Sequence, residues 1–138
     1  MKTILVGLDG SPRADGVLAY AETLARIAGA KLFLVRCFSI PSDMAQAWPC
    51  SDEVLESALR VQAQKYLDDC AGRVPTELLA AVRAVLGDPW RAVCKTAIDE
   101  NVDLIVIGSH GYGGIDHLIG TTAAKVVNHA DRPVLVFR

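Results

Sequence analysis

The stretch VDLIVIGSHGYGG, residues 102–114, places an unbroken apolar run directly before a glycine-rich segment. A short run of this kind is typical of a parallel β-strand that is covered on both faces. Further on, Gly108, Gly111 and Gly120 followed by Thr121 give the spacing G-x2-G-x8-G-T. The stretch therefore predicts a buried strand that ends in a loop of small residues. In open parallel sheets, ligands bind beyond such strand ends.

The rest of the chain alternates between apolar runs and stretches of helical periodicity. Strands are predicted over residues 2–8, 31–38, 102–108 and 133–137, and a further one within 76–86. Helices are predicted from Ser11-Pro12 to residue 28, over about 51–71, after Asp88-Pro89, and from Gly120 to about 130, with residues 39–50 as a loop. Ser11 and Asp88 are expected to cap their helices. The alternation predicts an α/β fold, an open parallel sheet with helices on both faces.

Composition narrows the class of protein. The chain has 138 residues, is 51% hydrophobic and carries a net charge of −2, which suggests one domain spanning residues 1–138. No apolar run approaches the roughly 20 residues of a membrane span, and no Lys/Arg block suggests nucleic acid as a partner. The start MKTILVGLDG is too short in its apolar part for a signal peptide, so we expect a cytoplasmic protein.

The four cysteines do not form a recognisable metal or disulfide pattern. They are widely spaced and include no CxxC pair: Cys37, Cys50, Cys70 and Cys94. In a cytosolic chain this arrangement is typical of reduced and mostly buried thiols.

The glycine spacing has two interpretations. Glycines let the backbone approach a ligand, and the free N–H groups at the start of the last helix, at Thr121 and Thr122, suit phosphate oxygens. Alternatively, the segment simply turns and packs against the sheet. The Walker pattern GxxxxGK[ST] does not occur, and GxGxxG fails because Asp116 stands where the third glycine belongs.

Four motifs together resemble the universal stress protein family. They are VGLDGSP (residues 6–12), GDPW (87–90), DLIVIGSHGYGG (103–114) and GTTAAKVVNHADRPVLV (120–136), and the resemblance covers nearly the whole chain. It implies the sheet order 3-2-1-4-5, similar to the adenine nucleotide alpha hydrolases, and a homodimer. In the nucleotide-binding branch of the family it also implies ATP, with AMP or ADP as alternatives, bound between strands one and four. That branch usually has nine residues before the last glycine, whereas this chain has eight.

The resemblance also implies which residues contact the nucleotide, while Mg²⁺ would be held through the phosphates. For Asp9, the expected role is to accept from the adenine amino group or a ribose hydroxyl, and the alternative is to accept N–H groups within its own turn. For His110, the alternative to ligand contact is a backbone hydrogen bond or solvent exposure. The residues implied are Gly7, Leu8, Asp9, Cys37, Ile107, Gly108, His110, Gly111, Gly120, Thr121 and Thr122.

The sequence suggests regulation rather than catalysis. No general base, Walker-B acid or arginine finger is evident near the glycine segment, so we expect little or no ATPase activity. The predicted function is a nucleotide-binding stress-response protein, and the alternative is a dimeric stress scaffold that binds no nucleotide. An enzyme of nucleotidyl transfer is disfavoured because GLDGSP lacks the SGGxDS-like pattern. Pairing of two copies is expected along the apolar edge formed by Val134, Leu135, Val136 and Phe137.

Overall fold

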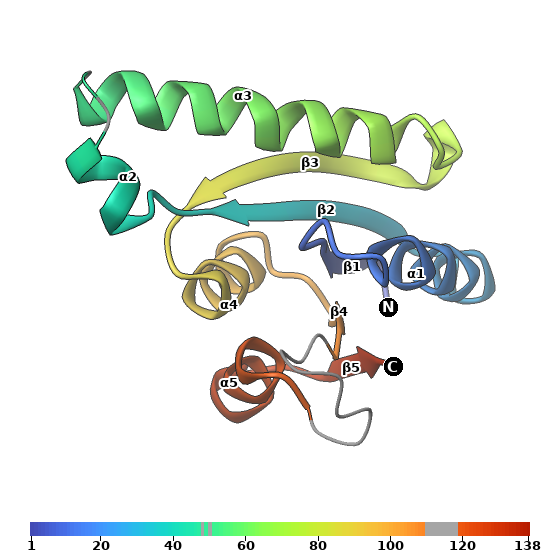
Figure 1. Cartoon of the computed structure of the whole chain (residues 1–138). Helices are drawn as coiled ribbons and strands as arrows, with labels where there is room; N and C mark the ends of the chain where they lie inside the picture. The colour runs from blue at the N-terminus through green and yellow to red at the C-terminus, as the bar shows by residue number, and fades with distance from the viewer. Residues whose placement is uncertain (48, 50, 110–118) are drawn as a thin grey trace.

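The computed structural model describes residues 1–47, 49, 51–109 and 119–138, which form a five-stranded parallel sheet with helices on both faces (Figure 1). The strands lie side by side in the order β3-β2-β1-β4-β5. This arrangement confirms the predicted fold class and strand order. The strands are β1 (Thr3–Gly7), β2 (Lys31–Phe38), β3 (Leu79–Leu86), β4 (Leu104–Gly108) and β5 (Val134–Phe137).

Two pairs of helices cover the two faces of the sheet. On one face, α1 (Ala14–Ala28) and α3 (Asp52–Ala71) pack against the central strands. On the other face, α4 (Pro89–Asp99) and α5 (Thr121–His129) form a second layer. A short helix α2 (Ser42–Ala47) follows β2, and a single 3-10 turn, η1 (Thr76–Leu78), precedes β3.

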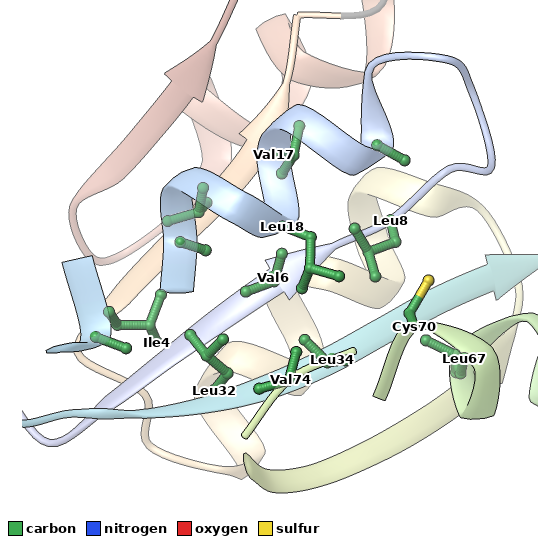
Figure 2. Packing of buried hydrophobic residues seen from close by; sticks show 14 of the residues in the cluster. Ile4, Val6, Leu8, Val17, Leu18, Leu32, Leu34, Leu67, Cys70 and Val74 are labelled. Carbon is green, nitrogen blue, oxygen red and sulfur yellow. The ribbon is translucent and has the colours of Figure 1, made fainter. Parts of the chain in front are cut away.

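The central strands are apolar throughout because both of their faces are buried. Successive side chains of a strand point to opposite faces, so Ile4 and Val6 of β1 join the cluster beneath α1 and α3, while Leu5 joins the other cluster. In β4, Val106 and Ile107 divide in the same way. Figure 2 shows the first cluster, in which Val17 and Leu18 of α1 meet side chains from β1, β2 and α3.

Helix α1 begins later than the sequence predicts. Its N-cap is Arg13, and the Ser11 hydroxyl makes no capping hydrogen bond, so the predicted capping role of Ser11 is wrong. The Ala14 N–H, which a capping Ser11 hydroxyl would accept, donates instead to the Ser11 carbonyl at 3.0 Å. In the preceding turn, the Asp9 carboxylate accepts from the Ser11 N–H at 2.9 Å. The helix ends as predicted, at Gly29 with φ of +64°.

Other differences are local. The segment predicted as a loop contains α2, whose side chains are not buried and so leave no apolar periodicity in the sequence. Asp88 occupies the N-cap position of α4 without a side-chain hydrogen bond, although Pro89 starts the helix as predicted. Ile98 and Val127, which fit the apolar faces of their helices by spacing, are 55% and 45% exposed. Periodicity therefore located the helices but misplaced the margins of their buried faces.

A carboxylate links the beginnings of the two central strands. Asp103 accepts hydrogen bonds from the backbone N–H groups of Lys2, at 2.6 Å, and Thr3, at 2.9 Å. These two hydrogen bonds favour the ionised form, so they lower the pKa of the Asp103 carboxyl below its ordinary value of 3.8. The interaction holds the end of the sheet that lies opposite to the ligand-binding edge expected for this fold.

We predict that Asp103→Asn reduces stability at neutral pH and flattens its acid dependence. Because the folded-state pKa is lowered, this carboxylate stabilises the fold above pH 3.8 and loses that contribution as pH falls through its folded-state pKa. The measurement is urea unfolding between pH 2.5 and 7. Asp99→Asn, which removes an exposed carboxylate paired with Lys95 within α4, is the matched control and should change stability by no more than about 0.5 kcal/mol. Equal effects of the two substitutions would contradict the role of Asp103.

Candidate functional site

A cavity of about 450 Å³ lies at the carboxyl edge of the sheet. At this place the strand order changes direction: β2 and β3 lie on one side of β1, and β4 and β5 lie on the other. Open α/β sheets bind ligands at this switch point. The ends of β1, β2 and β4 and the first turns of α4 and α5 contribute the lining: Gly7, Leu8, Asp9, Gly10, Ser11, Pro12, Val35, Arg36, Cys37, Pro89, Val93, Ile107, Gly108, Thr121, Thr122, Ala123 and Val126.

The structure brings most of the sequence-predicted residues together around this cavity. Gly120 is the N-cap of α5 and is buried, but it is not among the lining residues. His110 and Gly111 lie outside the described residues. The predicted residues that do line the cavity are Gly7, Leu8, Asp9, Cys37, Ile107, Gly108, Thr121 and Thr122.

The start of α5 gives one end of the cavity a positive character. Gly120 has an extended backbone, with φ of −60° and ψ of 159°, and its carbonyl accepts from the Ala124 N–H at 2.9 Å. The amides before Ala124 therefore lack partners within the helix. Thr121 and Thr122 are exposed and line the cavity. Unpaired amides together with the helix dipole suit an anionic group at this end.

Asp9 accepts an N–H group within its own turn, which is the alternative role given above, and it also lines the cavity. Its Oδ1 accepts from the Ser11 N–H at 2.9 Å and so shapes the turn between β1 and α1. Within that turn, Gly10 has a φ of +72°, a conformation that side chains other than glycine rarely adopt. A carboxylate has about four acceptor positions, so this single bond leaves capacity for a ligand donor.

Cys37 supplies an apolar wall rather than a nucleophile. Burial raises the pKa of the Cys37 thiol to about 12, and Asp88 raises it further while Arg36 acts in the opposite direction. The Sγ atom lies 3.7 Å from the carbonyl oxygen of Pro89, to which it donates. The thiol is therefore neutral at physiological pH. Free thiols at Cys37, Cys70 and Cys94 agree with the expected reduced state, and Cys50 lies outside the described residues.

Ser109 lies behind the cavity and joins three elements. Its hydroxyl is buried and accepts from Nη1 of Arg13 at 2.8 Å, while its N–H donates to the Phe137 carbonyl at 2.8 Å. These bonds tie the start of α1 and the end of β5 to the end of β4. Ser109 is not among the lining residues, so its interactions in the structure are with the protein.

Several lining residues were not predicted from the sequence. Val35 could have been found by strand alternation, since it shares the face of Cys37 two residues later in β2. Pro89 and Val93 belong to a helix whose first turn only the fold brings to this edge. Arg36 has no sequence signal at all, because an isolated arginine near a strand end is ordinarily a surface residue.

The described residues provide neither a cluster of metal-binding side chains nor a helix that could span a membrane. Among residues 1–109 apart from 48 and 50, and 119–138, no group of three or more His, Cys, Asp or Glu side chains could hold a metal ion. In the same part of the chain, every helix is too short or too polar to cross a membrane.

The chain belongs to the universal stress protein family, whose family model matches residues 1–138. A universal stress protein of Thermus aquaticus is 34% identical over 141 residues, which cover 99% of this chain and 98% of that protein.

Solved structures of universal stress proteins share the fold. That of a Methanocaldococcus jannaschii protein superposes with a TM-score of 0.82 at 23% identity, covering 98% of this chain and 94% of its own. A universal stress protein in complex with cAMP has a TM-score of 0.74 at 22% identity, covering 99% and 97%. One from Archaeoglobus fulgidus in complex with dAMP has a TM-score of 0.69 at 22% identity, covering 100% and 98%.

We predict that Gly10→Ala destabilises the protein more than Gly29→Ala. Both glycines have positive φ, which costs about 1–2 kcal/mol for alanine. At Gly10 an added Cβ would also lie 2.5 Å from Nη1 of Arg36, whereas at Gly29 it would meet nothing within 4 Å. Urea unfolding of the two variants therefore isolates the contact between the β1–α1 turn and Arg36. Equal losses of stability would show that the arginine yields freely.

Proposed function

We propose that this chain is a regulatory protein of the nucleotide-binding branch of its family and binds an adenine nucleotide in the cavity at the carboxyl edge. ATP is the proposed ligand, with ADP and AMP as alternatives. One observation carries the proposal. Residues that the sequence singled out in separate segments, such as Asp9, Cys37, Gly108 and Thr121, line a single cavity.

The cavity has the size and polarity that a nucleotide requires. Small-molecule sites usually measure about 300–1,000 Å³, and this one measures about 450 Å³. Val35, Cys37 and Val93 offer apolar walls for a base, whereas the first turn of α5 offers N–H groups for phosphates. Asp9 offers an acceptor for an amino or hydroxyl group.

Solved relatives support the choice of ligand. One neighbouring universal stress protein was solved with cAMP and another with dAMP, and both ligands are adenine nucleotides. Mg²⁺ is proposed to enter with the phosphates, because magnesium often keeps several waters and binds through phosphate oxygens. The described residues offer no metal cluster of their own.

A regulatory role fits the lining better than catalysis. Hydrolysis of a phosphoanhydride needs a positioned water, metal ligands and a group that stabilises developing charge. Among the described lining residues, Asp9 is the only carboxylate, Arg36 is the only cationic side chain, and there is neither lysine nor histidine. Binding to the folded state alone would instead stabilise it by mass action and order the surrounding turns.

We also propose that two copies pair along β5 and that the protein functions in the cytoplasm as a single domain. Strand β5 pairs with β4 on one side and forms an edge of the sheet on the other. Its four residues are all partly exposed, although all of them are apolar. An unpaired apolar edge of this kind is a ready template for a second chain. A dimer that binds no nucleotide remains the alternative function.

We predict that Thr121→Asp weakens nucleotide binding without lowering stability. The carboxylate would repel phosphates at the start of α5, yet an acidic residue in a first turn stabilises a helix by about 0.3–1 kcal/mol. Isothermal titration with ATP and Mg²⁺ should show a dissociation constant raised about tenfold or more, equivalent to about 1.4 kcal/mol. Thermal unfolding should show no decrease in the melting temperature.

The control is Thr76→Asp, which adds the same charge at the exposed start of η1, away from the cavity. It should leave ATP binding unchanged. No binding of ATP, ADP or AMP to the wild-type protein at millimolar concentration would contradict the proposed function and favour the scaffold.

For the dimer, we predict that Val136→Lys shifts the protein toward the monomer in sedimentation velocity. A lysine on an edge strand disfavours pairing because its charge must be desolvated. Val61→Lys, on the exposed side of α3, is the control and should not change the oligomeric state. If Val136→Lys remains folded and dimeric, pairing through β5 is wrong.

A further inference from the structure

Arg36 lies between two hollows of the molecule. It lines the cavity described above and also a second hollow of about 290 Å³ between the end of β2 and α3. Arg36 and Cys37 are common to both linings, so the two hollows meet at the end of β2. The second hollow is lined by Arg36, Cys37, Phe38, Ser39, Leu59, Gln62, Ala63 and Tyr66.

The guanidinium group of Arg36 is held between two surfaces. Its Cζ lies 4.7 Å from the centroid of the Tyr66 ring, a cation–π contact with α3. On its other side it lies against Gly10, where even a Cβ would come within 2.5 Å of Nη1. A group restrained in this way loses less side-chain entropy when it binds a partner.

The charge of Arg36 has no carboxylate partner among the described residues. Its Nη1 is buried and makes no hydrogen bond, and no described carboxylate forms an ion pair with it. By contrast, Arg73 pairs with Asp15, and Arg83 pairs with Glu100 at 2.6 Å. A buried donor that has no acceptor loses its hydration without compensation, and the cost is larger for a charged group. The guanidinium therefore lacks a protein acceptor, and its N–H groups other than those of the buried Nη1 are the ones that can donate to a ligand in the cavity.

The surroundings favour an anion as that acceptor. No described carboxylate is paired with Arg36, since Asp9 accepts from the Ser11 N–H and Asp15 pairs with Arg73. The Ser11 hydroxyl, next to Gly10 in the first cavity, is also buried without a hydrogen bond. Guanidinium and hydroxyl donors together suit the oxygens of a phosphate or carboxylate.

The Arg36 position is separate from the start of α5. Strand β1 lies between β2 and β4, so the ends of β2 and β4 are two strand spacings apart, or roughly 10 Å. The guanidinium of Arg36 contacts Tyr66 of α3, which covers one face of the sheet, whereas α5 covers the other face.

We propose that the junction of the two hollows is an anion subsite in which Arg36 binds a phosphate or carboxylate group. The anion is either a free oxyanion or a second anionic group on the ligand of the first cavity. The second of these sources rests on the proposed nucleotide-binding function. In that case the preferred ligand is an adenine nucleotide with anionic groups at two separated positions.

The first test uses inorganic phosphate and the full-length ¹⁵N-labelled protein. We expect millimolar phosphate, compared with chloride at equal ionic strength, to shift the Arg36 Nε–Hε resonance saturably in NMR spectra. The backbone amides around the two hollows should shift with the same saturation, and Arg36→Gln should abolish these phosphate-dependent amide shifts. Arg83→Gln is the matched control, because Arg83 also lies over an aromatic ring, that of Phe33, but is ion-paired and outside both hollows. Arg83→Gln should leave phosphate binding unchanged.

The second test identifies the source of the anion with 5′-AMP and adenylosuccinate, which is AMP carrying a 1,2-dicarboxyethyl group on the N6 nitrogen of its base. If the anion belongs to the ligand, adenylosuccinate should bind the wild type about tenfold more tightly than AMP, and Arg36→Gln should remove this preference. If the anion is free, AMP and phosphate should bind together. If Arg36→Gln fails to fold, Arg36→Lys takes its place. Lysine keeps the positive charge but lacks the planar, bidentate donor geometry of the guanidinium, so the preference for adenylosuccinate should again be lost.

The outcomes separate this inference from the proposed function. Binding of AMP with no response of Arg36 to phosphate and no preference for adenylosuccinate overturns the anion subsite alone. Failure of AMP to bind, with a saturable phosphate shift at Arg36, overturns the proposed function and supports the subsite as a free oxyanion site. Phosphate binding that persists unchanged in a folded Arg36→Gln variant overturns the role of Arg36.

Discussion

Burial of β1 and β4 on both faces is the constraint on which the rest of the structure depends. Ile4, Leu5 and Val106 are fully inaccessible to solvent because helices lie above and below them. The backbone N–H and C=O groups of strands enclosed in this way can form hydrogen bonds only with neighbouring strands. Helical crossovers keep these strands parallel, so all of their carboxyl ends lie at the same edge of the sheet. The carboxyl ends of β1 and β4 thus come together with no helix between them.

This arrangement explains why polar and unusual backbone features concentrate at one edge. Asp9 and Gly10, the latter in a left-handed conformation, follow the end of β1. The first turn of α5 comes after β4 in the chain. At the opposite edge, the Asp103 carboxylate accepts two backbone hydrogen bonds, from Lys2 and Thr3. One edge therefore provides stability while the other provides a cavity.

Sequence reasoning located the elements and much of the candidate site, and its errors have physical causes. Strand β2 was predicted with its observed limits because an unbroken apolar run leaves little ambiguity. The predicted capping role of Ser11 was wrong because the Ala14 N–H donates to the Ser11 carbonyl and the helix begins after Arg13, a choice of backbone partner that the residue type does not reveal. Helix α2 escaped prediction because a helix with no buried face has no periodic signature.

The sequence by itself determined the alternation of strands and helices, the apolar character of the central strands and the small residues at their ends. Only the tertiary structure decided that Arg36, Pro89 and Val93 line the same cavity as Asp9 and Thr121. It also decided that the guanidinium of Arg36 lies between Gly10 and Tyr66 without a carboxylate partner. The physical reason is that hydrophobic patterning is local along the chain, whereas pairing of charges depends on which distant segments the sheet order brings together.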